Sequence, residues 1–471
     1  MPPVPRPPSA PPALWRDADF RRLWFGQTLS QLGAHASQVT LPLVAVVALA
    51  ADAGQLGALR AVEQAPILLF SLFAGAWVDR RRTRDVMVWA DFGRALALAA
   101  IPVAYVLGGL GLPLLLVVAF LVGVLSVFFD VACQASLVRL VERGELVRCN
   151  SALEGSRSAA QTGGPALGGA LVSLLSAPVA NAAGALFFAV SFLSIRRIRR
   201  REETGGAEER AAEERTAEER TTEERTSEGQ TAEGQTVART ERPAPRLWPR
   251  VREGLQLVCT DALLRSVGLA SALYQFSFAA LMTVLLLFLP RELHLSGTAV
   301  GLVLAAVGPG AVIGSLLAAK LPGRWGYGRV LVGAAVLGDG ALLCVPALHG
   351  SAGPAASTAY ASSAASAWAT VLALMAVNFL FGMGSQTVNV TLMAVRQART
   401  PVRLQGRVVA TINVVGMGLT PLGSLLGGRL AEWWGLHTGL LVTAAALTLS
   451  PLFMTLSPLR RLGRSLPAAR R

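Results

Sequence analysis

The chain has 471 residues, of which 53% are hydrophobic and only 15% are charged. This composition excludes an ordinary water-soluble globule and indicates that lipid surrounds much of the protein surface. The net charge of +14 does not indicate a nucleic-acid partner, because the arginines stand in short clusters between apolar runs.

The chain begins with a proline-rich stretch, residues 1–19, that lacks the apolar core and cleavage site of a signal peptide. We expect it to be a disordered cytoplasmic tail. Apolar segments follow, each near the length of about 20 residues that a helix needs to cross a bilayer. They predict an all-α integral membrane protein with twelve transmembrane helices. The segments are 23–49, 56–78, 86–107, 111–135, 151–175, 178–195, 266–289, 298–320, 329–349, 367–393, 408–430 and 436–456.

A charged stretch, residues 196–245, separates the sixth segment from the seventh. It opens with RRIRRR and continues as a degenerate repeat of the form TAEER. Because it has almost no apolar residue to bury, we expect a cytoplasmic linker that tethers two halves rather than a binding module. The apolar stripe that follows, beside Arg250 and Arg252, predicts a helix on the inner membrane surface.

The six segments on either side of the linker are related to each other. One offset aligns Gly57 with Gly301, and a second offset, longer by twelve, aligns Pro165 with Pro421. The change falls at residues 351–366, which we expect to form a long outer loop. Two pseudo-symmetric six-helix bundles are therefore predicted, 20–195 and 246–457, with substrate bound between them and a cytoplasmic tail at 458–471.

Arginines mark the loops on one side of the predicted membrane. On the other side, residues 107–112 and 176–178 carry no cation, and Arg291 and Arg429 are the exceptions. The bias predicts a multi-pass protein of the inner (plasma) membrane with both termini in the cytoplasm. The arginine clusters are Arg80, Arg81, Arg82 and Arg84; Arg139, Arg143 and Arg148; Arg324 and Arg329; and Arg396, Arg399, Arg403 and Arg407.

Three sets of motifs stand out. GAWVDRRRTR, residues 75–84, follows the second segment, and GPALGG, residues 164–169, lies in the fifth. A pair of matching stretches, residues 142–169 and 399–428, accompanies FRRLWFGQTLSQLG at residues 20–33. Together they resemble the major facilitator superfamily, in the proton-coupled drug and siderophore exporter branch that includes enterobactin and macrolide efflux proteins. Arg82 and Ala160 stand where that family commonly has glycine.

The resemblance implies the major facilitator fold and export of a small amphipathic molecule, a drug, an antibiotic or a siderophore, by proton antiport. It also implies that the glycine- and proline-rich turn of the fifth segment is an exporter motif, and a simple kinked packing seam is the alternative. The exporter-motif residues are Gly164, Pro165, Gly168 and Gly169.

Charged residues near the cytoplasmic ends of the spans form a second group. Asp91 with Arg94, and Glu154 with Arg157, stand three residues apart on one helix face. We interpret the group as a gating network that closes the cytoplasmic side in the outward-facing state, and static packing pairs are the alternative. Its members are Gly75, Asp79, Arg80, Asp91, Arg94, Asp130, Glu154 and Arg157.

Three titratable residues lie deeper: Glu63, Asp339 and His35. A carboxylate in apolar surroundings can take up and release a proton near neutral pH, so these are candidates for proton coupling. Glu63 is the first choice, with an Arg60 ion pair as the alternative. Asp339 ranks below it because the ninth span is usually peripheral in the superfamily, and for His35 a packing role is favoured.

Polar residues within apolar segments are candidates for the substrate pocket, although each could equally join helices. They are Gln27, Gln31 and Gln38 in the first segment, Tyr274 and Gln275 in the seventh, and Asn378, Gln386 and Asn389 in the tenth.

Other classes of protein are excluded or held as alternatives. The only lysine, Lys320, follows Ala319, so no Walker loop exists for an ATP-driven pump. The dispersed histidines and cysteines predict neither an enzyme nor a metal or other cofactor. We expect a monomer whose partners are a small-molecule substrate, protons and the lipid bilayer, with no nucleic acid. A proton-coupled importer and a transport-dead sensor or scaffold remain open.

Overall fold

The computed structural model describes residues 14–78, 80–140, 146–198, 258–347, 364–400 and 416–464, together with 256, 408, 411 and 412. Within these ranges the chain is helical and contains no strand. Most of the predicted N-terminal tail, linker, surface helix and outer loop, and the gating candidate Asp79, lie outside the described residues.

The first bundle consists of six long helices with two short helical pieces at the ends of the first. Its elements are η1 (Leu14–Arg16), α1 (Ala18–Leu43), η2 (Val44–Ala48), α2 (Ala53–Val78), α3 (Thr83–Val106), α4 (Leu112–Leu140), α5 (Leu146–Leu175) and α6 (Ala177–Arg196).

The second bundle repeats this arrangement with more interruptions. Its elements are α9 (Ala262–Arg291), α10 (Gly297–Ala305), α11 (Val307–Trp325), α12 (Tyr327–Ala341), α13 (Cys344–Ala347), α14 (Ala364–Arg399), α16 (Thr420–Leu447), α17 (Leu449–Leu456) and η5 (Pro458–Arg461).

The helices account for the twelve predicted spans. Nine stretches of the described chain are long and apolar enough to cross a membrane. One of them, Gly416–Leu456, turns at Gly435, where φ is 82°, and so holds the eleventh and twelfth predicted segments. The second and fifth predicted spans are not among the nine stretches. They correspond to α2, which packs against α4, and α5, which packs against α1. The expected twelve-helix fold is therefore confirmed over the described residues.

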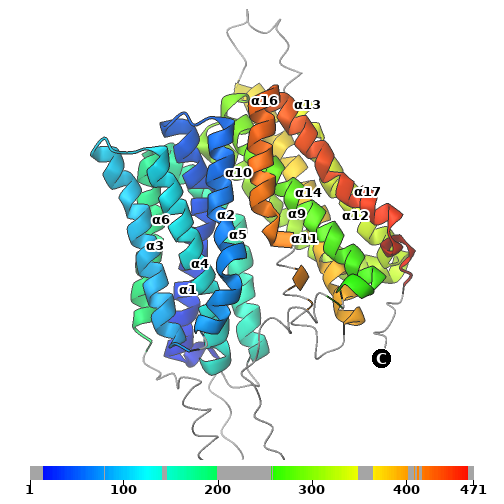
Figure 1. The fold of residues 1–471 in the computed structure, drawn as a ribbon, viewed down its shortest axis with the longest axis horizontal. Helices are drawn as coiled ribbons and strands as arrows, with labels where there is room; N and C mark the ends of the chain where they lie inside the picture. The colour runs from blue at the N-terminus through cyan, green and yellow to red at the C-terminus, as the bar shows by residue number, and fades with distance from the viewer. Residues whose placement is uncertain are drawn as a thin grey trace, which may run out of the picture.

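The two bundles lie side by side in Figure 1, α1 to α6 in blue and cyan and α9 to α17 in green to red. They meet where α2 packs on α16 and α5 on α10. Glycines make these contacts close: a Cβ on Gly169 would clash with the carbonyl oxygen of Gly297, and one on Gly428 would come within 2.5 Å of that of Ala53. These glycines lie toward the helix ends on the predicted outer side, so that side is closed.

The chain ends differ from the prediction of free tails. Asp17 caps α1, accepting from the backbone N–H of Asp19 at 2.8 Å, and Trp15 packs edge-on against Trp24 with ring centroids 5.2 Å apart. The prediction of a disordered tail is therefore wrong for residues 14–19. At the other end, the carbonyl oxygen of Gly463 accepts from the N–H of Tyr327 at 2.9 Å, which fixes the start of the predicted C-terminal tail against α12.

Replacing Gly169 with leucine is expected to disfavour closure of the outer side, because the added side chain would meet backbone atoms of α10. Gly163→Leu on the same helix is the matched control, since nothing lies within 4 Å of a Cβ there. The measurement is labelling of a cysteine placed at Gln386 by a membrane-impermeant thiol reagent applied from the cytoplasmic side. We expect markedly slower labelling for Gly169→Leu only. Equal labelling of both variants would contradict this assignment of the closed side.

Candidate functional site

A cavity of about 550 Å³ opens between the bundles, on the predicted cytoplasmic side of the glycine contacts. Its described walls come from α5, α9, α11, α12, α14, α17, Ile412 and the start of the Gly416–Leu456 stretch, so the second bundle supplies most of the lining. It reaches Arg396, a member of the predicted cytoplasmic arginine clusters. A volume of this size accommodates a drug-sized molecule.

Asp339 is the only acidic residue among the described residues that line the cavity. It belongs to α12, which approaches α14 closely because Gly338 faces Gly384: a Cβ on Gly338 would be 3.1 Å from the Cα of Gly384. Its side chain makes no hydrogen bond or ion pair with any described residue, and the residue is only 3% exposed. The cavity wall thus carries one carboxylate that no described residue compensates.

Three aromatic rings line the cavity near Asp339. Tyr274 and Phe278 on α9 stack at 5.6 Å between centroids and 7° between planes, and Phe278 stacks on Phe381 of α14 at 5.4 Å and 12°. Sequence reasoning found Tyr274 but not the other two. The spacing of Tyr274 and Phe278, four residues apart on one helix face, was the available signal.

Two arginines complete the charged lining. Arg396 of α14 has a buried Nε without a hydrogen-bond partner and makes no ion pair with a described residue. Arg157 projects from α5 on the opposite wall, and its charge acts on Asp130. Arg157 was predicted as part of the gate and Arg396 only as a topology marker, because a sequence does not show which face of a helix borders the cavity.

The predicted pocket residues divide between the cavity and the helix interfaces. Tyr274, Gln275, Gln386 and Asn389 line the cavity. Asn378 is buried and donates to the carbonyl oxygen of Leu374 at 3.0 Å, so it faces its own helix. The structure likewise does not place Gln27, Gln31 or Gln38 among the described lining residues. Their first segment packs against α5 and α6 inside the first bundle.

Glu63, the first choice for proton coupling, already has a partner. Its Oε2 lies 3.1 Å from Nη1 of Arg60, and both side chains are 15% exposed. Neither residue is among the described cavity lining. His35 contacts Gln38, with Nδ1 3.4 Å from Oε1, and Gly164 packs against it. The alternatives weighed for these residues, an ion pair and a packing role, describe their contacts in this state.

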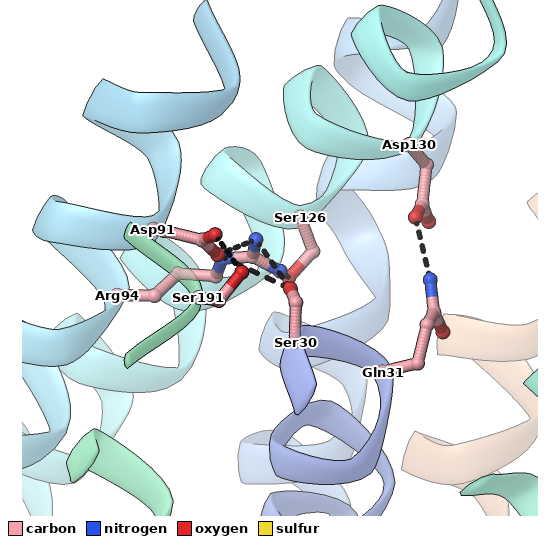
Figure 2. Close-up of polar contacts among 7 residues, drawn as sticks. All are labelled: Ser30, Gln31, Asp91, Arg94, Ser126, Asp130 and Ser191. Carbon is pink, nitrogen blue, oxygen red and sulfur yellow. Dashed lines mark hydrogen bonds and ion pairs between the residues drawn. The ribbon is translucent and has the colours of Figure 1, made fainter. Parts of the chain in front are cut away.

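Asp91 and Arg94 form an ion pair buried at the centre of the first bundle (Figure 2). Ser191 donates to Asp91 at 2.5 Å, and Ser30 donates to Asp91 at 3.1 Å. Arg94 also donates to Ser126 at 3.4 Å. These partners come from α1, α4 and α6, so the pair does not bridge the two bundles. In this state Asp91 and Arg94 pack inside the first bundle, and their part in gating stays a prediction.

The other gating candidates are scattered. Asp130 accepts from Gln31 at 3.0 Å within the first bundle, as Figure 2 also shows. Glu154 and Arg157 are both exposed and do not pair with each other, so the expected ion pair is absent from this state. Arg80 is exposed, and a Cβ on Gly75 would meet nothing within 4 Å. Close packing is therefore not the reason for glycine at position 75 here.

The predicted exporter motif forms a seam that joins three helices. Gly164 and Gly168 let α5 approach α1, where a Cβ on Gly168 would lie 2.7 Å from the carbonyl oxygen of Ala36. Pro165 and Gly169 face Gly301 of α10 in the other bundle. The motif thus sits on the helix that couples the first bundle to the second.

Comparison with known proteins agrees with this architecture. The family model described as Major Facilitator Superfamily matches residues 23–356 and 267–471. The chain belongs to the major facilitator superfamily. It is a multi-pass membrane transporter of a small-molecule substrate and not an enzyme.

Two relatives and two solved structures illustrate the similarity. Multidrug efflux pump Tap of Mycolicibacterium fortuitum is 26% identical over 393 residues, 82% of each chain. Multidrug efflux pump Tap of Mycobacterium tuberculosis (strain ATCC 25618 / H37Rv) is 25% identical over 439 residues, 89% of this chain and 88% of its own. Nucleoside transporter NupG superposes with a TM-score of 0.62 at 13% identity, covering 93% of this chain and 98% of its own. A bacterial homologue of the iron transporter ferroportin in an inward-facing state superposes with a TM-score of 0.66 at 16% identity, covering 94% of this chain and 99% of its own.

Removal of one partner from the buried Asp91–Arg94 pair is expected to destabilise the protein strongly. Arg94→Gln leaves Asp91 as an uncompensated buried charge, which lowers the free energy of unfolding by about 3–5 kcal/mol. Arg22→Gln is the control, because Arg22 pairs with Asp19 at 2.8 Å on a partly exposed surface, where loss costs less than about 1 kcal/mol. Thermal unfolding in detergent measures both. Similar losses of stability would refute the packing role of the buried pair.

Proposed function

We propose that this protein is a secondary active exporter that moves a small amphipathic drug, antibiotic or siderophore out of the cytoplasm in exchange for protons. The alignment with two multidrug efflux pumps over most of the chain supports the direction and the class of substrate. The loop arginines support an inner-membrane protein with both termini in the cytoplasm. One chain supplies both walls of the cavity, which supports a monomer as the transporting unit.

The observation that carries the proposal is the uncompensated Asp339 at the cavity wall. While the cavity is open to the cytoplasm, water can solvate an ionised carboxylate. Closing the cavity around that charge without a partner is costly, because desolvation of an isolated carboxylate is strongly unfavourable. Asp339 must therefore acquire a proton or a substrate group before the bundles rock to the other state.

This requirement couples the outward movement of substrate to the inward movement of a proton. A proton taken up from the outer side neutralises Asp339 and permits the return to the inward-facing state, where the proton leaves and substrate binds. Glu63 has its charge balanced by Arg60 and does not face the described cavity, so it meets this requirement less well. Glu63 and His35 remain candidates for coupling, and an importer or a sensor of the same fold remains the alternative function.

Asp339→Asn and Glu63→Gln separate these assignments in proteoliposomes. A panel of macrolides, siderophores and aromatic dyes is screened for counterflow, and uptake driven by an imposed pH gradient is then measured. We expect Asp339→Asn to exchange a substrate by counterflow. Its gradient-driven accumulation is expected to be more than about tenfold lower than that of the intact protein. Glu63→Gln is expected to retain both activities, and Asp339→Glu to restore coupling.

The reverse result, uncoupling by Glu63→Gln and normal accumulation by Asp339→Asn, would transfer the proton site to Glu63. Accumulation by the intact protein that persists after collapse of the proton gradient would overturn proton antiport altogether.

A further inference from the structure

The described cavity lining carries more positive than negative charge. Arg157 and Arg396 face it from opposite bundles, and Asp339 is the single acidic residue. Asp130 lies near Arg157 and balances part of its charge. Arg396 has no such neighbour: its Nε is buried without a partner, and no described carboxylate pairs with it. An unpaired guanidinium in a membrane-embedded cavity is costly unless a ligand or water satisfies it.

The charged groups lie at different depths. Gly338, next to Asp339, packs against Gly384 and the backbone nitrogen of Ser385. Arg396 lies three turns further along α14, about 16 Å nearer its cytoplasmic end by helix rise. Arginine has five donors in a planar fork that matches a carboxylate or phosphate. The cytoplasmic part of the cavity therefore favours an acidic group, which Asp339 is too deep to oppose.

The stacked rings of Tyr274, Phe278 and Phe381 lie at the deep end of the cavity. Their planes are nearly parallel, within 7° and 12° of each other. A flat aromatic molecule can extend such a stack, gaining contact area at a favourable geometry. The apolar side chains of Val388, Leu392 and Met393 line the cavity between this stack and Arg396.

We propose that the cavity selects a planar aromatic molecule that carries an acidic group, with the ring system against Tyr274, Phe278 and Phe381 and the acid on Arg396. The proposal rests on the export function above and specifies its substrate class. Because the acid and Asp339 occupy separate ends of the cavity, a hydrogen-bond donor on the ring system is the substrate group that compensates Asp339 during export.

Two dyes with one ring system test the proposal: fluorescein, which is anionic, and a cationic rhodamine ester. Binding to the purified full-length protein in detergent is followed by fluorescence anisotropy, without any gradient. We expect fluorescein to bind at least about tenfold more tightly than the rhodamine ester. Arg396→Gln is expected to bind fluorescein at least about tenfold more weakly than the intact protein. Arg329→Gln is the matched control, since Arg329 is exposed and is not among the described lining residues. Phe278→Leu tests the ring contact and is expected to weaken both dyes.

Preference for the rhodamine ester, lost in Asp339→Asn, would overturn the proposal in favour of a cationic substrate. Unchanged fluorescein affinity in Arg396→Gln would overturn the assignment of the acid to Arg396. Each binding variant is also checked by thermal unfolding, so that loss of fold is not mistaken for loss of contact. Failure of the export function is a separate result: fluorescein would bind as expected, yet the proteoliposomes would show no transport of it.

Discussion

The constraint on which this structure depends is that a charge inside a bilayer must be paired, hydrogen-bonded or solvated. The described charges within the spans follow it in different ways. Asp91 and Arg94 neutralise each other among serines at the centre of the first bundle, and Glu63 is balanced by Arg60. Asp339 and Arg396 have no such partner among the described residues and lie on the cavity wall. The distribution of satisfied and unsatisfied charge among the described residues therefore separates the paired groups inside the bundles from the groups that we propose for transport.

Close backbone contact between the bundles determines where the cavity lies. Glycines on α2 and α16, and on α5 and α10, allow helices from opposite bundles to touch at the outer side. Side chains at these positions would force the helices apart, so the outer closure depends on their absence. Because the bundles meet there, the space between them remains at the other side and reaches Arg396, one of the predicted cytoplasmic arginines. The predicted exporter motif belongs to this contact, since Pro165 and Gly169 face Gly301 of α10.

The two ends of the cavity wall differ in chemistry. The deep end combines aromatic surface with one carboxylate, whereas the cytoplasmic end presents arginine. In the proposed mechanism, a substrate binds through its ring at the deep end and through its acid at Arg396. A proton and a donor group on that ring system then compensate Asp339 in turn, so that neither state closes around an uncompensated carboxylate.

The sequence by itself determined the number of spans and the two related halves and predicted the topology, because segment length, the internal repeat and loop arginines are local properties of the chain. It could also name every ionisable residue within a span. It could not show that Glu63 is paired whereas Asp339 faces the cavity, nor that Gln31 bonds to Asp130 and Asn378 to its own helix. Each helix has several faces, and the apolar pattern of a membrane helix does not mark the one bordering a cavity. Only the packing of α12 against α14, and of one bundle against the other, decided which charges were paired and which faced the cavity.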